Sequence, residues 1–252
     1  MAKILAITNQ KGGVGKTTTT VNLAASLAAT KHRVLLIDLD PQGNATMGSG
    51  VDKMALAHTI YHVLLEEKTV EEVRVVNTQG KFDLIPANRE LAGAEVELVQ
   101  EMAREWRLKN ALKKIEAEYD YILIDCPPAL NLLTVNALCA AQAVMIPMQC
   151  EYYALEGLSD LVQTIKRVRA NLNPQLEIEG LLRTMFDPRN TLAQQVSEQL
   201  QRHFGDKVYR TVIPRNVRLA EAPSYGMPVL YHDKTSKGAQ AYLALASELA
   251  RK

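Results

Sequence analysis

The chain has 252 residues, of which 47% are hydrophobic and 23% charged. This ordinary globular composition excludes wholesale disorder. At this length a chain buries roughly 70–75% of its unfolded surface, so it needs no disulfide or metal to fold, and a single α/β domain over 1–252 is the simplest expectation. The 29 basic and 28 acidic residues nearly cancel, so the total charge excludes no class of partner.

The segments expected to form strands are short apolar runs, and they alternate with longer helical patterns. The predicted strands are 3–8, 33–39, 82–86, 121–125, 143–147, 180–185 and 208–214. Most of them are continuously apolar, as in a parallel sheet covered by helices on both faces. The predicted helices include 16–29, 95–118, 155–172 and 238–250. This order predicts a doubly wound, mostly parallel α/β sheet with helices on both faces.

The cysteines and the apolar runs indicate the cellular compartment of the protein. Cys126, Cys139 and Cys150 are odd in number and share no CxxC spacing. We therefore expect buried free thiols in a reducing compartment, with no disulfide or zinc site. No secretory signal opens the chain, and its longest apolar stretch, 137–148, is too short to span a bilayer. These features predict a soluble cytoplasmic protein.

A glycine-rich segment, QKGGVGKTT over 10–18, follows the first predicted strand and opens the first long helix. Three glycines allow backbone N–H groups to close around phosphate oxygens, and the positive end of the helix dipole points to the same place. In such a phosphate loop Lys16 supplies charge to the β- and γ-phosphates, and the Thr17 hydroxyl ligates Mg²⁺. The residues expected to bind the nucleotide here are Lys11, Gly12, Gly13, Val14, Gly15, Lys16, Thr17 and Thr18.

The loop departs from the common pattern G-x-x-x-x-G-K-[ST] at its start. Gln10 stands where that pattern has glycine, and a second lysine, Lys11, lies within the loop. A lysine at this place can point away from its own nucleotide. It could then reach a nucleotide held by a second subunit.

Three aspartates follow predicted strands. Asp38 and Asp40 end the second strand, and Asp125 ends the 121–125 strand. The carboxyl ends of parallel strands form the edge where ligands bind in this architecture, so we expect all three there. Asp125 is placed like a Walker B aspartate that holds Mg²⁺ through water, and Asp38 would assist in the outer coordination of the metal. Because Cys126 and not a glutamate follows Asp125, the attacking water is weakly activated and hydrolysis should be slow.

The segment KGGVGKTT is a deviant Walker A motif, and with it the chain resembles the ParA/Soj chromosome- and plasmid-partitioning ATPases, which are relatives of MinD. Further matching stretches are 38–44, 125–128, 151–157 and 213–218. The resemblance implies a P-loop ATPase that uses ATP and Mg²⁺, with Lys11, Lys16 and Asp40 as its catalytic residues. It implies that Asp40 orients the attacking water and that Pro214 and Asn216 contact the base. A simple turn after the strand would also account for these last two residues.

The same resemblance implies how the protein acts. ATP would drive formation of a homodimer in which Lys11 of each subunit neutralises phosphate charge across the interface. The 151–157 segment would lie near that interface. The dimer would bind double-stranded DNA without sequence preference, on the nucleoid rather than on a membrane. A ParB/Spo0J-type centromere-binding protein with a basic N-terminal peptide would stimulate slow ATP turnover.

Charge is unevenly distributed along the chain. Residues 202–252 hold nine lysines and arginines against four acids, whereas the remainder holds 20 basic against 24 acidic residues. A basic surface of this kind is typical of a nonspecific contact with the phosphate backbone, although a scatter of solvated cations gives the same count. By resemblance Arg189 and Arg218 match DNA-binding positions, and Lys234 and Lys237 are plausible additions.

Two further functions compete with partitioning. A MinD-like membrane-associated ATPase would end in an amphipathic helix with bulky apolar residues, whereas this chain ends in the weakly amphipathic sequence ALASELARK. The second competing function is that of a metabolic enzyme on the same scaffold, such as a nitrogenase-reductase relative or a synthetase. A reductase would need cysteines that ligate an Fe–S cluster. Because no segment precedes the first strand, we expect no operator-binding helix-turn-helix.

Overall fold

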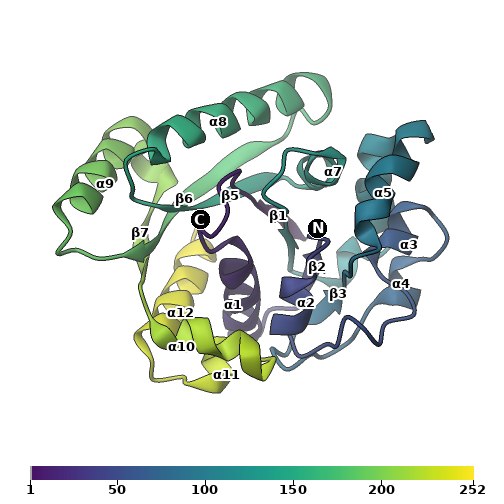
Figure 1. Cartoon of the computed structure of the whole chain (residues 1–252), viewed down its shortest axis with the longest axis horizontal. Helices are drawn as coiled ribbons and strands as arrows, with labels where there is room; N and C mark the ends of the chain where they lie inside the picture. Colours follow the sequence, from purple (N-terminus) through teal and green to yellow (C-terminus); the bar gives the residue numbers. More distant parts are fainter. Residues whose placement is uncertain (1) are drawn as a thin grey trace.

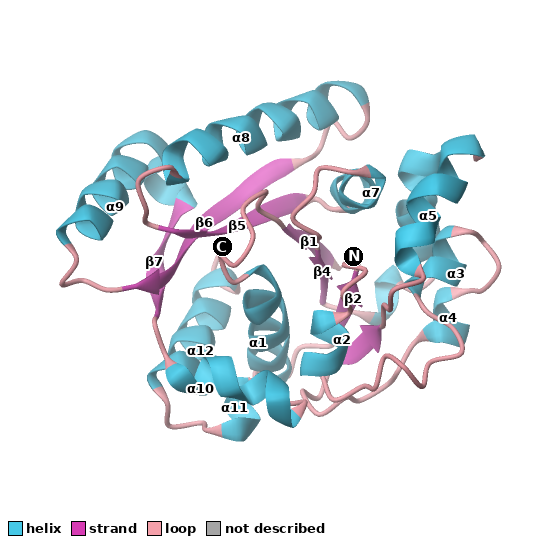
Figure 2. Ribbon diagram, viewed as in Figure 1, coloured by secondary structure: helices cyan, strands magenta, loops and turns pink. Residues whose placement is uncertain are grey.

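The computed structural model describes residues 2–252, and its centre is one seven-stranded sheet (Figure 2). Every strand pairs in parallel with its neighbours, in the order β3-β2-β4-β1-β5-β6-β7. The strands are β1 Lys3–Ile7, β2 Val34–Asp38, β3 Asp83–Ile85, β4 Tyr121–Asp125, β5 Ala143–Gln149, β6 Glu177–Phe186 and β7 Val208–Pro214. The predicted doubly wound parallel sheet is therefore confirmed, with all seven strands at the expected places.

Helices cover both faces of this sheet (Figure 1). On one face lie α3 Ile60–Leu64, α5 Leu91–Glu97, α6 Arg107–Leu112, α7 Leu132–Ala140, α8 Ala154–Asn171 and α9 Thr191–Phe204. On the other face lie α1 Lys16–Ala29, α2 Asn44–Gly48, α10 Val217–Glu221, α11 Val229–His232 and α12 Lys237–Leu249. The short helix α4 Val70–Val73 packs beside α3.

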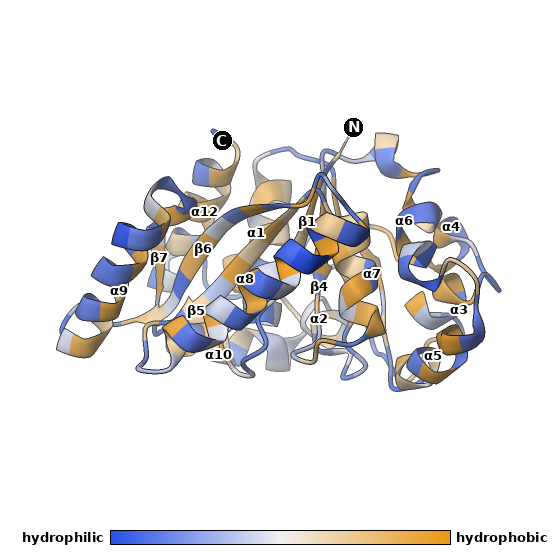
Figure 3. Cartoon of the chain, turned by 90° about the horizontal axis from the view of Figure 1, so that it is seen from above, coloured by the Kyte–Doolittle hydropathy of each residue, from blue (hydrophilic) through white to orange (hydrophobic). Residues whose placement is uncertain are grey.

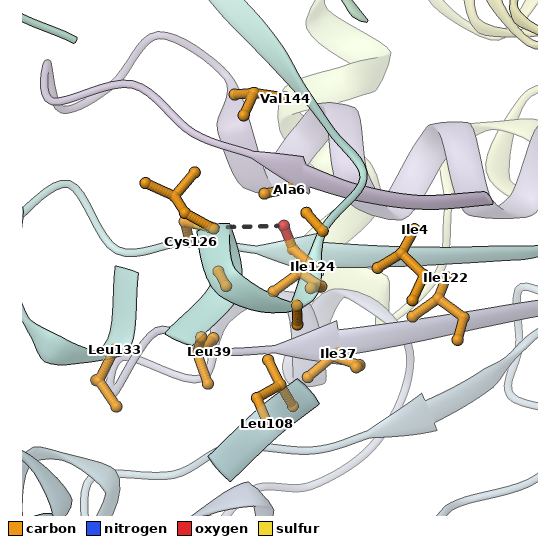
Figure 4. Close-up of a cluster of buried hydrophobic side chains, with 14 of the residues drawn as sticks. Ile4, Ala6, Ile37, Leu39, Leu108, Ile122, Ile124, Cys126, Leu133 and Val144 are labelled. Atoms are coloured by element: carbon orange, nitrogen blue, oxygen red, sulfur yellow. Dashed lines mark hydrogen bonds between the residues drawn. The ribbon is translucent and has the colours of Figure 1, made fainter. Parts of the chain in front are cut away.

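Two hydrophobic cores result because successive side chains of a strand point to opposite faces of the sheet. In β1, Ile4 and Ala6 join the core under α7 and α8, whereas Leu5 and Ile7 join the core under α1 and α12. Figure 4 shows part of the first core, where isoleucines of β1, β2 and β4 pack together with Leu108 of α6 and Leu133 of α7. Burial of both faces accounts for the continuously apolar strands.

One predicted helix, over 95–118, is wrong. The segment contains the end of α5, then 3-10 turns at Leu98–Gln100 and Arg104–Trp106, then α6 and a last 3-10 turn at Glu116–Glu118. Ala103 lies between these two 3-10 turns and has a left-handed backbone with φ of 53°, which a continuous helix does not contain. Burial of Leu98, Leu108 and Ile115 in one core produced the helical spacing without a continuous helix.

The two edges of the sheet differ in what lies on them. Both termini lie on the side where the strands begin, whereas α2 and α10 lie on the opposite side, where the strands end (Figure 3). Within residues 2–252, none of the helices combines the length and apolar character that a membrane span requires. The three cysteines are buried free thiols, as predicted.

Candidate nucleotide and nucleic-acid sites

The phosphate loop connects the end of β1 to the start of α1. Gly13 and Gly15 have left-handed backbones, with φ of 73° and 87°, and such a backbone strains any residue with a Cβ. Gly15 is also the residue that precedes the first turn of α1, so this turn presents its free N–H groups to the loop. The Thr184 hydroxyl of β6 donates a 2.7 Å hydrogen bond to the carbonyl of Val14. The loop is therefore held from a strand far away in the sequence.

The two loop lysines occupy different environments. Lys16 is only 7% exposed, and its Nζ donates a 3.0 Å hydrogen bond to the carbonyl of Lys11 inside the loop. Burial lowers the pKa of Lys16, and the nearby carboxylates of Asp125 and Asp40 oppose that shift. The Lys11 ammonium instead lies half-exposed at the rim and forms an ion pair with Glu151, which follows β5. One lysine thus faces the space inside the loop and the other faces outward.

Two of the predicted aspartates are neighbours in the sheet. Asp38 and Asp125 are register partners at the ends of β2 and β4, and both are completely buried. Burial raises the pKa of Asp125, and the charge of Asp38 raises it further, against the hydrogen bond from the Thr20 hydroxyl. Burial also raises the pKa of Asp38. Two carboxylates in such a place repel each other unless a cation joins them.

The hydrogen bonds of these carboxylates separate their roles. Asp38 accepts from the Thr46 N–H at 2.8 Å, the Thr46 hydroxyl at 2.7 Å and the Asp40 N–H at 3.2 Å, so both of its oxygens are occupied. Asp125 accepts from the Thr20 hydroxyl at 3.0 Å through Oδ1. Its buried Oδ2 has no partner among the described residues. Asp38 therefore fixes the segment that carries Asp40, and Asp125 presents a free oxygen.

The free oxygen of Asp125 fits a magnesium ion. Hard divalent cations prefer oxygen ligands, and Mg²⁺ takes one or two from the protein while water and substrate phosphates supply the rest. Thr17 and Asp125 provide such oxygens at the mouth of the loop. No cluster of three His, Cys, Asp or Glu side chains capable of holding a metal occurs over residues 2–252. An Mg²⁺ ion that arrives with a nucleotide would bring phosphate oxygens as further ligands.

Asp40 lies at the opening of the site. It is 9% exposed, and its Oδ1 accepts a 2.9 Å hydrogen bond from the N–H of Gln42. The turn that follows requires Gly43, which has φ of 62° and where a Cβ would come within 2.7 Å of the carbonyl of Ala87. Asp40 is thereby held next to the loop, and its charge is close enough to influence the pKa of Lys16. Its role in orienting water remains a prediction.

Pro214 and Asn216 line a cavity of about 200 Å³ beside the phosphate loop. Gly15 and Thr18 form the loop side of this cavity, and Met185 of β6 forms another wall. Asn216 also has a structural task, because its Oδ1 accepts a 3.2 Å hydrogen bond from the N–H of Leu219 at the start of α10. The mostly apolar cavity, open to the phosphate loop, suits a nucleobase.

Arg189, Arg218, Lys234 and Lys237 are the four predicted DNA-binding residues. Arg189 follows β6 and pairs with Asp187 at 2.8 Å, and its side chain is 88% exposed. Arg218 in α10 pairs with Glu221 at 2.7 Å and with Asp233 at 3.4 Å, and remains half-exposed. Lys237 is the first residue of α12, and Lys234 follows Asp233 in the segment before it. All four therefore belong to the edge of the sheet that holds the nucleotide site, with each arginine partly neutralised by an acid.

Of the other basic residues of 202–252, Arg215 lines the cavity with Pro214 and Asn216 and so lies at this same edge, whereas several others lie elsewhere. Arg210, Arg251 and Lys252 line a separate open cleft of about 880 Å³ near the start of β7. Lys252 also contacts Glu179 at the start of β6, and its ammonium lies 4.0 Å from the ring centroid of Tyr209. The excess charge counted along the sequence is therefore divided between opposite edges of the sheet.

Comparison with known proteins identifies the family. Residues 2–178 match the family described as an AAA domain. The chain is 56% identical over 250 residues to the sporulation initiation inhibitor protein Soj of Bacillus subtilis, an alignment that covers 99% of each chain. It is 55% identical to the chromosome partitioning protein ParA of Caulobacter vibrioides, over 98% of this chain and 93% of that protein. The chain belongs to the Soj/ParA family of chromosome-partitioning ATPases.

The fold of this Soj/ParA chain also occurs in a protein of another name. The structure of cobyrinic acid a,c-diamide synthase from Mycobacterium smegmatis, with a bound ATP analogue and magnesium, superposes with a TM-score of 0.88. It is 38% identical, and the match covers 100% of this chain and 95% of that one. The same fold therefore occurs in a solved protein whose name is neither Soj nor ParA.

Several residues of this Soj/ParA site escaped the sequence analysis. Thr20, Thr46 and Thr184 orient Asp125, Asp38 and the phosphate loop. Thr20 could have been found, because it lies one helical turn after Lys16 on the face that carries the loop. Thr46 and Thr184 carry no local signal, since their partners lie 8 and 170 positions away. Glu151 lies in the 151–157 segment expected near the interface, but its pairing with Lys11, 140 positions away, has no local signal.

Proposed function

We propose that this Soj/ParA chain is an ATP-dependent dimerising switch that binds DNA nonspecifically and hydrolyses ATP slowly. One observation carries the proposal: the buried Lys16 faces the interior of the phosphate loop, whereas Lys11 lies at the exposed rim. A lysine at the rim contributes little to binding a nucleotide in its own subunit, because Lys16 already neutralises the phosphate charge there. Lys11 is well placed to neutralise phosphate charge across an interface.

ATP and Mg²⁺ suit the residues at this edge. The turn at Gly13–Gly15 and the start of α1 would hold the phosphates, and the cavity at Pro214 and Asn216 would hold the base. Thr17 and the free Oδ2 of Asp125 would hold the metal, one directly and the other through water. When bound, Mg²⁺ neutralises charge that develops on the transferred phosphoryl group. The solved relative from M. smegmatis holds an ATP analogue and magnesium, which supports this assignment.

The chain supplies positioning and charge rather than a strong base. Lys16 would stabilise charge on the phosphates, and Asp40 would orient the attacking water. Beside Asp125 stands Cys126, whose buried thiol has a pKa well above its usual range, because burial disfavours the thiolate. This thiol cannot take a proton from water at neutral pH. Slow turnover follows, and a stimulating partner of the ParB/Spo0J type would act on this step.

The surface around the site supports association of two copies. Tyr152 and Tyr153, which follow Glu151, are 74% and 70% exposed, and Leu130 of the loop after β4 is 46% exposed. Large apolar side chains at the same edge as Lys11 favour burial against another protein surface. Lys11 would leave Glu151 and reach the partner's nucleotide. Two copies would then bring two sets of arginines and lysines to bear on one DNA duplex, with a large gain in avidity.

The Asp40→Ala variant tests the switch. Without hydrolysis, we expect it to accumulate as a dimer with ATP and to remain a monomer with ADP, in mass measurements by light scattering. The double variant Lys11→Ala/Asp40→Ala is the matched control and should remain a monomer with either nucleotide. Nucleotide binding by both proteins is measured separately with a fluorescent ATP analogue. If Asp40→Ala binds ATP and stays monomeric, the dimerising switch is wrong.

A further inference from the structure

A groove lies between α8 and the end of α9, beside the start of β6 and away from the nucleotide site. Figures 1 and 3 show where the two helices lie. Its volume is about 340 Å³, which is near the lower end of the range for ligand sites. We propose that this groove binds an acidic peptide segment of another protein, with one bulky apolar side chain of the peptide inserted between the two helices.

The floor of the groove is apolar. It is formed by Val162 and Ile165 of α8, Leu176 and Ile178 around the start of β6, and Phe204 at the end of α9. Ile165 and Leu176 belong to the buried core, but Val162, Ile178 and Phe204 are only partly buried and keep apolar surface facing the groove. Covering that surface with an apolar side chain is favourable, at roughly 25 cal/mol for each Å² removed from water.

The rim of the groove is cationic. Lys166 and Arg169 line it from α8, and Lys207 lines it from the turn after α9. Within residues 2–252, none of these three side chains forms an ion pair. Glu177 is the one carboxylate at the groove, so the rim keeps a net positive charge.

Helix stability, DNA and lipid each account for only part of this surface. Cations in the last turn of a helix stabilise it through the helix dipole, which accounts for Arg169 but not for an unfilled apolar floor. Double-stranded DNA offers phosphates but no apolar group that could enter the groove. A membrane would match the charge, but a flat lipid surface contacts the rim of a concave site and leaves its floor empty. A peptide with acidic residues around an apolar side chain matches both the cationic rim and the apolar floor of the groove.

The groove is remote from the nucleotide. β6 has ten residues, so its start lies roughly 30 Å from its end, where Thr184 contacts the phosphate loop. A second copy bound at the nucleotide edge would leave the groove open. We therefore expect peptide binding with ATP, with ADP and without nucleotide, and this inference does not depend on the proposed switch.

The test uses the full chain and a fluorescein-labelled acidic peptide that carries a central Leu-Phe pair. Fluorescence anisotropy measures its affinity, and a second peptide with Ser-Ser in place of Leu-Phe separates charge from apolar contact. We expect the first peptide to bind about tenfold more tightly than the second. Equal affinity of the two peptides would overturn the proposal, because the apolar floor would then contribute nothing.

Two charge reversals on one helix locate the binding site. Arg169→Glu should weaken binding of the Leu-Phe peptide by about tenfold, because it removes a rim cation and adds a repelling charge. The matched control Arg167→Glu makes the same change on α8 at an exposed residue outside the groove, and should weaken binding less than about twofold. Equal losses would show an unspecific attraction and overturn the proposal. Thermal unfolding midpoints of both variants check that each is folded.

Competition separates DNA and lipid from a peptide as the occupant. Unlabelled duplex DNA and vesicles with anionic lipids are added to the complex at the same ionic strength. Displacement of the peptide by DNA from the wild type and from Arg218→Glu alike would assign the groove to nucleic acid and overturn the proposal. Displacement of the peptide by anionic vesicles, but not by neutral ones, would assign the groove to a membrane surface and would also overturn the proposal. Retention of the peptide in both experiments supports the proposal.

Discussion

The strands β2 and β4 carry opposite electrostatic arrangements at their two ends. Where they begin, Arg33 donates to Asp120 from its backbone N–H at 2.7 Å and from its guanidinium at 2.9 Å, in contact with solvent. These hydrogen bonds lower the pKa of Asp120 to about 2. Where the same strands end, Asp38 and Asp125 are buried side by side, and burial raises the pKa of both.

The difference shows where the fold tolerates unfavourable charge. The pair at the beginning of the strands is complete within the chain, and a ligand would add nothing to it. The pair at the end is incomplete, because Asp125 keeps a buried oxygen without a partner among residues 2–252. A bound cation would supply the missing partner. Four experiments test how the two edges of the sheet differ, beginning with the largest expected effect.

Asp125→Asn should reduce ATP hydrolysis by about 100-fold or more, because it removes the charged oxygen assigned to the metal. Its free energy of unfolding should stay within about 1 kcal/mol of the wild type, since the variant also removes charge repulsion from a buried site. Phosphate release and urea unfolding measure the two quantities. Asp120→Asn is the control and should hydrolyse ATP normally. A large loss of stability without loss of hydrolysis would reverse the assignment.

Thr46→Val should lower the free energy of unfolding by about 1–3 kcal/mol. The fully buried Thr46 hydroxyl donates to Asp38 at 2.7 Å and accepts from the N–H of Ala87 at 2.9 Å. Valine leaves the Ala87 N–H unpaired and removes one hydrogen bond to Asp38, which keeps the one from the Thr46 N–H. Thr235→Val removes an exposed hydroxyl that donates to Asp233 at 2.8 Å, and should cost less than about 0.5 kcal/mol. Equal losses of unfolding free energy for Thr46→Val and Thr235→Val, measured with urea, would contradict the expectation that the buried hydroxyl next to Asp38 contributes more.

Arg218→Glu and Arg251→Glu place the same charge reversal on opposite edges of the sheet. We expect Arg218→Glu to weaken DNA binding with ATP by about tenfold or more, and to reduce the slope of affinity against salt. Arg251→Glu should change DNA affinity by less than about twofold. Dimer formation with ATP should persist in both variants. A larger loss from Arg251→Glu in filter retention would move the DNA surface to the other edge.

Asp120→Asn should have the smallest effect and a defined pH dependence. Because the folded state lowers the pKa of Asp120 to about 2, the Arg33–Asp120 pair stabilises the fold above about pH 4, and this contribution disappears between about pH 4 and pH 2. The side chains are exposed, so solvent screening limits the loss at neutral pH to about 0.5 kcal/mol. Urea unfolding of variant and wild type should therefore converge as the pH falls. A difference that grows in acid would contradict the assignment.

Much of the fold could be predicted because its signals are local. Continuously apolar strands, turns after them and a glycine loop before a helix occur within short stretches, so all seven strands and the edge with Asp38, Asp40 and Asp125 were predicted. The false helix over 95–118 shows the limit of periodicity. The spacing of apolar residues indicates which side chains are buried, and a chain whose helix is interrupted at Ala103 can bury the same side chains.

The sequence by itself determined the parallel sheet, the phosphate loop and the family to which the chain belongs, because these follow from patterns of neighbouring residues. Only the tertiary structure decided that Lys11 meets Glu151, that Thr184 holds the loop, and that the basic residues of 202–252 divide between two edges. It also created the groove between α8 and α9 from segments separated in the chain. Contacts over such separations depend on how the strands are ordered in the sheet, and no local pattern encodes that order.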